Sequence, residues 1–132
     1  MQRVILPIAK ETEEIGRRVL GCGLTVHRTL GPGFKERIYE QAFCLELDSV
    51  GIPYQKEKKV SVRYKEWEIP GHQIDLLVDG CVIVELKSIS KLKQVHTRQV
   101  VSYLRATGLR LGFVINFNVD VLKDGGIKRV AL

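Results

Sequence analysis

The chain has 132 residues, of which 45% are hydrophobic and 27% charged, and its formal net charge is +6. These values are typical of a single folded domain over residues 1–132 and exclude a disordered chain. No apolar run approaches the length that spans a bilayer, so we expect no membrane partner. The three cysteines lie far apart without a C-x-x-C motif, which argues against a structural zinc site and favours free thiols in a reducing cytoplasm.

Three helices are predicted from apolar spacing and from stop signals. The first spans residues 8–30, where apolar side chains recur on one side, and it ends at the Gly-Pro-Gly sequence of 31–33. The second spans residues 34–49 and stops before a further glycine and proline. The third spans residues 94–107 and is closed by Gly108.

Strands are expected in the segments that alternate or form short apolar runs. Residues 59–64 alternate and should be half-buried, and Asp79-Gly80 is a strong hairpin signal. A helix between two strands implies a parallel pair, so we predict an α/β protein with a mixed sheet flanked by helices. The expected strands are 59–64, a short partner strand ending at Pro70-Gly71, 73–78, 81–87, 110–117 and a last edge strand at 125–132.

Three charged side chains, Asp75, Glu85 and Lys87, interrupt the most apolar strands. Because side chains alternate along a strand, Glu85 and Lys87 share one face. A two-residue hairpin loop would put Asp75 on the opposite face, whereas a three-residue loop would bring it to the same face, and we predict the latter. A loop at 79–81 places Asp75 directly across from Glu85, and a loop at 78–80 makes them diagonal neighbours.

Two carboxylates in contact repel each other unless a cation lies between them. Oxygen ligands without a neighbouring His or Cys suit Mg²⁺ or Mn²⁺ rather than zinc. Lys87 could then balance the charge or hold a phosphate. The alternative is a buried ion pair between Lys87 and Glu85 or Asp75 that serves only the fold.

The helices add further candidates. Glu36 lies in the first turn of the second helix, where a carboxylate is expected from the helix dipole alone. His96, Gln99 and Tyr103 form one stripe on the third helix, which is also typical of amphipathic boundary residues. No Asp or Glu lies between Leu86 and Val119, so this basic segment favours nucleic-acid phosphates or is simply a solvated face. The candidate nucleic-acid contacts are Lys91, Lys93, His96 and Arg98.

The same residues resemble three known motifs. Asp75, nine intervening residues and then Glu85-Leu86-Lys87 resemble the core motif of the PD-(D/E)XK nuclease superfamily. Residues 33–39 resemble the G-x-x-E-x-x-Y signature of one small-protein family within it, and residues 99–103 resemble the Q-x-x-x-Y motif of RecB-like nucleases. The resemblance runs from about residue 14 to residue 130.

The resemblance implies a restriction-endonuclease-like αβββαβ core, with a central mixed sheet flanked by helices. It implies that Asp75 and Glu85 bind the metal with help from the Leu86 carbonyl. Glu36 would be the acid on a helix that completes the site.

By the same resemblance, Lys87 would orient the attacking water or stabilise charge that develops on the phosphate. Gln99 and Tyr103 would position this lysine and the nucleic-acid backbone. Two positions depart from the pattern: Ile74 stands where the motif has proline, a common replacement, and Gln73 stands where the family usually has arginine. The second departure removes a positive charge near the phosphate and weakens the expected hold on the substrate.

These features together predict a Mg²⁺- or Mn²⁺-dependent nuclease that hydrolyses phosphodiester bonds. DNA is favoured over RNA, and little sequence specificity is expected, because no set of residues is suited to reading bases. Two alternatives stay open, a non-catalytic nucleic-acid-binding module on a nuclease fold and a protein-interaction domain. We also consider a homodimer, because one small domain offers little surface to a duplex.

Overall fold

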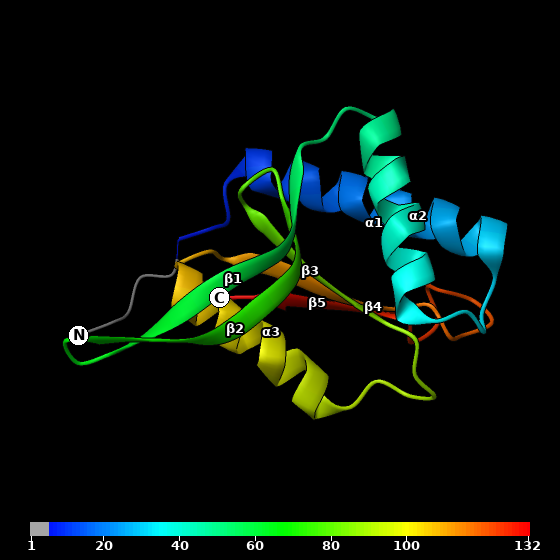
Figure 1. Cartoon of the computed structure of the whole chain (residues 1–132). Helices are drawn as coiled ribbons and strands as arrows, with labels where there is room; N and C mark the ends of the chain where they lie inside the picture. The colour runs from blue at the N-terminus through cyan, green and yellow to red at the C-terminus, as the bar shows by residue number, and fades with distance from the viewer. Residues whose placement is uncertain (1–5) are drawn as a thin grey trace.

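Residues 6–132 are described by a computed structural model, so the first five residues of the predicted domain lie outside it (Figure 1). In this range three helices cover a five-stranded sheet, with α1 and α2 on one face and α3 on the other. The helices are α1 (Lys10–Leu30), α2 (Glu36–Ser49) and α3 (Gln94–Thr107). The strands are β1 (Tyr54–Tyr64), β2 (Trp67–Val78), β3 (Val82–Lys87), β4 (Leu111–Asn116) and β5 (Ile127–Ala131).

The sheet is mixed, with its strands in the order β1-β2-β3-β4-β5. β3 and β4 run parallel and are joined by the α3 crossover, whereas the other neighbouring strands are antiparallel. β5 lies at one edge of the sheet, as expected for the last strand. The predicted α/β fold, a mixed sheet flanked by helices, is therefore confirmed.

Two apolar cores fill the spaces between the helices and the sheet. Glycines in α1 let this helix approach β4 closely, because a Cβ at Gly16 would lie only 2.9 Å from Leu111 Cδ2. The core beneath α1 and α2, here the α1–α2 core, includes Val19, Val26, Phe43, Leu47, Leu76, Val84 and Phe113. The core beneath α3, here the α3 core, includes Ile74, Ile83, Val100, Leu104 and Val114.

The prediction of two separate strands on either side of Gly71 is wrong, because both segments belong to the continuous strand β2. Gly71 has a φ of 134° and no partner in β1. The pairing steps from Val60–His72 to Ser61–Pro70, so Gly71 is the extra residue of a bulge. A bulge also accommodates the neighbouring proline, which cannot donate a ladder hydrogen bond.

The prediction that residues 59–64 are half-buried is also wrong, because within this range only Val60 is partly buried. The strand lies in a part of the hairpin that β3 does not cover. α1 and α2 each begin two residues later than predicted, at Lys10 and Glu36, whereas α3 has the predicted bounds. Among the described residues, no helix combines the length and apolar character that crossing a bilayer requires.

Candidate active site

The turn between β2 and β3 sets the two strand carboxylates opposite each other. The pairs Leu76–Val84 and Val78–Val82 leave residues 79–81 as a three-residue loop. The predicted three-residue loop is therefore confirmed in its 79–81 form. This register, continued by one pair, places Asp75 directly across from Glu85.

At the point where β2 and β3 diverge, hydrogen bonds to the two carboxylates take the place of the regular backbone–backbone hydrogen bonds between the strands. The Asp75 N–H donates to Glu85 Oε1 (3.0 Å), and the Leu86 N–H donates to Asp75 Oδ2 (3.0 Å). Glu85 is only 2% exposed. Each side chain is thus held by the backbone of the other strand, which fixes both carboxylates with little freedom.

A local irregularity in β1 and β2 accompanies this arrangement. Leu76 packs into the α1–α2 core and Ile74 into the α3 core, although residues two apart share a face in a regular strand. Glu57 lies across from Asp75, is absent from the pairing and has a φ of 51°. A non-glycine residue at positive φ is strained, and such irregularities often re-aim side chains beside active sites.

The burial of Glu85 and its neighbour Asp75 affect its protonation. Burial, followed by the charge of Asp75, raises the pKa of Glu85 to about 8. Burial also raises the pKa of Glu36, whereas the charge of Lys87 lowers it and that of Asp75 raises it. Glu36, Asp75 and Lys87 are therefore close enough to influence one another's charge.

Glu40 is a neighbour of the site that the sequence analysis did not identify. It lies one turn after Glu36 on α2, and burial followed by the charge of Asp75 raises its pKa, whereas Lys56 lowers it. Residues four apart project from the same side of a helix, so the spacing from Glu36 was the signal available in the sequence.

α3 brings Tyr103 to the same carboxylates from the opposite face of the sheet. Tyr103 is 3% exposed, and burial, followed by the charges of Glu85 and Asp75, raises its pKa to about 12. The neighbouring Gln99 side chain lowers the pKa of Tyr103. The ring of His72 packs edge-on against Tyr103 with centroids 5.0 Å apart.

Lys87 lies half-buried at the end of β3. Within residues 6–132, the ion pairs are Arg17–Glu14 and Arg129–Glu13, and neither involves a strand charge of the site. The alternative of a purely structural pair between Lys87 and a carboxylate therefore lacks the direct contact that it requires.

The chain that leaves β3 is anchored by side-chain hydrogen bonds to the backbone of other segments. Ser88 Oγ donates to the Phe34 carbonyl (2.5 Å), which ties the end of β3 to the segment before α2. Asn116 is 1% exposed; its Nδ2 donates to the Ile89 carbonyl (3.0 Å), and its Oδ1 accepts from the Ile89 N–H (3.0 Å). These contacts fix the position of Glu36 relative to the end of β3, and they fix the loop that follows Lys87.

Tyr39, the last residue of the G-x-x-E-x-x-Y sequence, has a structural role. Its buried hydroxyl donates to the Gly31 carbonyl (2.5 Å) and accepts from the Phe34 N–H (3.2 Å). The ring stacks on Phe117 with centroids 4.5 Å apart. Tyr39 thereby holds the turn that leads into α2 and Glu36.

Tyr39→Phe is expected to lower the free energy of unfolding by about 1 to 3 kcal/mol, because it leaves two backbone groups without their partner while keeping the ring. Urea unfolding measures the change. Tyr64→Phe is the matched control, because Tyr64 is 55% exposed. Equal losses in the two variants would contradict the role assigned to the Tyr39 hydroxyl.

The predicted nucleic-acid contacts lie along the loop before α3 and on α3 itself. Lys91, Lys93 and Arg98 are exposed. His96 Nδ1 accepts a hydrogen bond from the Lys93 N–H (2.9 Å) and so caps α3. This contact gives His96 a structural role, and its contact with nucleic acid stays a prediction.

The oxygen ligands around Asp75 fit a hard divalent cation. The candidate donors are the two facing carboxylates and the Leu86 carbonyl, and burial, followed by the charge of Asp75, raises the pKa of Glu85. Within residues 6–132, no group of three or more His, Cys, Asp or Glu is close enough to hold a metal. The structure therefore brings Asp75 and Glu85 together but does not include Glu36 in a formed ligand cluster.

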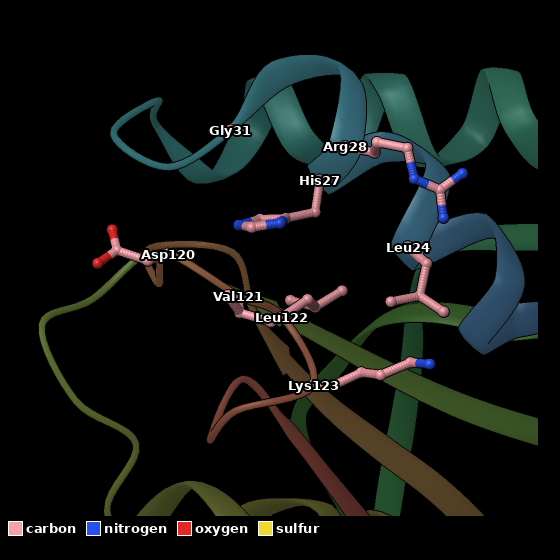
Figure 2. A pocket seen from close by; sticks show the side chains of 8 residues that line it. All are labelled: Leu24, His27, Arg28, Gly31, Asp120, Val121, Leu122 and Lys123. Carbon is pink, nitrogen blue, oxygen red and sulfur yellow. The ribbon is translucent and has the colours of Figure 1, made fainter.

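A cavity of about 400 Å³ lies elsewhere, between the end of α1 and the loop after β4 (Figure 2). Its lining combines His27, Arg28 and Lys123 with Asp120. His27 Nε2 lies 2.7 Å from the Val119 carbonyl, so this histidine holds the loop. Neither Asp75 nor Glu85 lines this cavity, so it is separate from the candidate active site.

Comparisons with known proteins identify the family of the chain. A family model described as the PD-(D/E)XK nuclease superfamily matches residues 13–130, nearly the whole chain. The mixed sheet flanked by helices is consistent with the restriction-endonuclease-like fold. No curated protein and no solved structure matches the chain.

Proposed function

Because the chain belongs to the PD-(D/E)XK nuclease superfamily, we propose that it is a metal-dependent nuclease that hydrolyses phosphodiester bonds. DNA is the favoured substrate, and we expect little sequence specificity. The observation that carries this proposal is the facing pair of Asp75 and Glu85, with Lys87 two residues further along β3. We further propose membership of the G-x-x-E-x-x-Y family, a single domain over the chain, and a cytoplasmic location.

Asp75, Glu85 and the Leu86 carbonyl would hold Mg²⁺ or Mn²⁺, with Glu36 completing the site from α2. The Leu86 N–H already donates to Asp75, and a strand residue directs its N–H and carbonyl to the same side. When bound, such an ion lowers the pKa of its water and polarises a phosphoryl oxygen. The backbone hydrogen bonds to both carboxylates keep these ligands in place before the substrate arrives.

Three other side chains act on the phosphate and on the water. Lys87 supplies a fixed positive charge where negative charge develops during attack. Tyr103, with its pKa raised to about 12, keeps its proton at neutral pH and can donate a hydrogen bond to a phosphate oxygen. Gln99 lies beside the Tyr103 hydroxyl and orients it.

The test is cleavage of labelled single- and double-stranded DNA and RNA, with Mg²⁺, Mn²⁺ or EDTA. We expect cutting that requires a metal and is faster on DNA. Binding without cutting, unaffected by metal and by Asp75→Ala, would instead identify a non-catalytic nucleic-acid-binding module. Light scattering on the same samples tests the proposed homodimer.

Lys91→Ala, Lys93→Ala and Arg98→Ala are each expected to weaken binding and to flatten its salt dependence. Each lost phosphate contact should lower the slope of log affinity against log salt by about 0.9 on duplex DNA. Fluorescence anisotropy between low and moderate salt measures these slopes. Lys128→Ala, at the exposed edge strand β5, is the control, and an equal change there would contradict a localised phosphate-binding surface.

A further inference from the structure

β1 and β2 extend beyond the rest of the sheet as a two-stranded ribbon, here defined as residues 58–73 (Figure 1). β3 pairs with β2 only over Leu76–Val78, so the ribbon has no third strand beside it. In Figure 1 it projects away from α1 and α2, while α3 lies along its base.

One face of the ribbon carries four large apolar side chains that are between 37% and 56% exposed. Val62 pairs directly with Ile69, and Tyr64 pairs with Trp67, so all four share this face. Val60, two residues before Val62, packs against the α3 core, so the face continues the side of the sheet that α3 covers.

Two hollows lie beside the ribbon, and Val62 and Val60 each contribute to the lining of one of them. One, of about 310 Å³, lies between the ribbon and α3 and includes Arg63 and Arg105 in its lining. The other, of about 330 Å³, includes Lys59 and Gln73, which pair directly across the ribbon. His72 lines both hollows. No Asp or Glu lines either of them, although Glu68 pairs directly with Arg63 across the ribbon. The two hollows together are here called the path.

The path is connected to the carboxylate pair through His72 and Tyr103. His72 packs edge-on against Tyr103, and the charges of Glu85 and Asp75 reach the Tyr103 hydroxyl. Trp67 lies eight residues from Asp75 along β2, a distance of about 27 Å in an extended strand. A polymer that lay along the path would therefore have several of its monomers between the reacting centre and the tip of the ribbon.

The side chains along the path indicate which class of molecule it binds. The cationic side chains that line the hollows attract a polyanion, and exposed aromatic rings stack on bases only when those bases are unpaired.

We propose that the ribbon and its two hollows bind a single-stranded stretch of the nucleic-acid substrate, several nucleotides away from the bond that is cut. Trp67 and Tyr64 stack on bases, and Lys59, Arg63 and Arg105 contact phosphates. The position of the cut bond rests on the proposed nuclease function, but binding by the ribbon does not require cleavage.

Trp67 is the single tryptophan of the chain, so its fluorescence reports on the ribbon alone. Wild-type protein in EDTA is titrated with a 20-nucleotide DNA strand, the same RNA strand and a blunt 20-base-pair duplex. We expect saturating quenching by the single strands, with the same midpoint as anisotropy, and weaker quenching by the duplex. The comparison of DNA with RNA shows which strand the ribbon prefers. Binding by anisotropy without any change in Trp67 emission would overturn the proposal.

The double variant Tyr64→Ala/Trp67→Ala is expected to bind the DNA strand about tenfold to a hundredfold more weakly. Arg105→Ala should lower the single-strand salt slope by about 0.7. Leu45→Ala on α2 is the matched control, because Leu45 is also an exposed apolar residue, at 68%. Thermal melting of each variant establishes that the fold is kept.

The outcomes separate this inference from the proposed function. Cleavage by wild type, with unchanged affinity in the double variant, would overturn the ribbon proposal and leave the nuclease standing. Quenching of Trp67 without any cleavage would support the ribbon and contradict the nuclease. If the double variant converts a dimer into a monomer and binds DNA normally, the ribbon is a contact between two copies and the proposal fails.

Discussion

Asp75→Asn and Lys87→Met are each expected to lower the rate of metal-dependent DNA cleavage by on the order of 10³-fold. Asparagine removes the charge but keeps an oxygen that can accept from the Leu86 N–H, as Asp75 Oδ2 does at 3.0 Å. Methionine keeps the length and apolar stem of Lys87 but loses the charge that stabilises the reacting phosphate. Single-turnover cleavage of a labelled oligonucleotide in Mg²⁺ and in Mn²⁺ measures the loss.

Both variants should remain folded. Asp75→Asn removes a negative charge that raises the pKa of Glu85, so the metal-free variant should be at least as stable as wild type. Lys87 forms no ion pair within residues 6–132, so Lys87→Met should change the free energy of unfolding by less than about 1 kcal/mol. A loss of about 3 to 5 kcal/mol, in a protein that never cuts nucleic acid, would instead show that Lys87 serves the fold.

The metal-free protein is expected to lose stability as the pH rises toward 8. Burial, with the charge of Asp75, raises the pKa of Glu85 from 4.5 to about 8. Between these values the folded protein keeps a proton on Glu85 that the unfolded chain releases, so the free energy of unfolding falls with increasing pH. A bound cation replaces that proton, so the rise in Tm caused by Mg²⁺ should grow from pH 5 to pH 8.

Glu85→Gln isolates this effect. Glutamine can still accept from the Asp75 N–H but carries no charge, so the variant should be more stable than wild type at pH 8 without metal, by about 2 to 4 kcal/mol. It should also lose most of the response to Mg²⁺. Glu11→Gln, an exposed residue of α1, is the control. A pH slope that is the same in Glu85→Gln and wild type would show that Glu85 is not the group responsible.

Much of the site follows from local rules of sequence. Strand alternation puts Glu85 and Lys87 on one face. Whether the hairpin loop has an odd or an even number of residues then decides whether Asp75 lies on that same face. Because the loop has three residues, Asp75 lies across from Glu85. The bounds of α3 likewise follow from apolar spacing and from Gly108, which adopts a left-handed conformation at the end of the helix.

Other features depend on packing that sequence patterns do not encode. Around Asp75 and Glu57, side chains two residues apart point to opposite faces of the sheet, which requires both strands to be irregular at the same position. Neither residue is a glycine, so the sequence does not indicate this irregularity. His72 and Asn116 acquire their roles from Tyr103 and Ile89, which are far away in the sequence. The exposure of the ribbon follows from the short pairing of β3 with β2, which alternation alone does not reveal.

The most direct test of the central claim is calorimetric titration of Mn²⁺ into metal-free wild type and into Asp75→Asn at pH 8. The account predicts a saturable site in wild type that is lost in Asp75→Asn, although both proteins are folded. Equal Mn²⁺ binding by the two proteins, or no binding by folded wild type, would contradict a metal centre at Asp75 and Glu85.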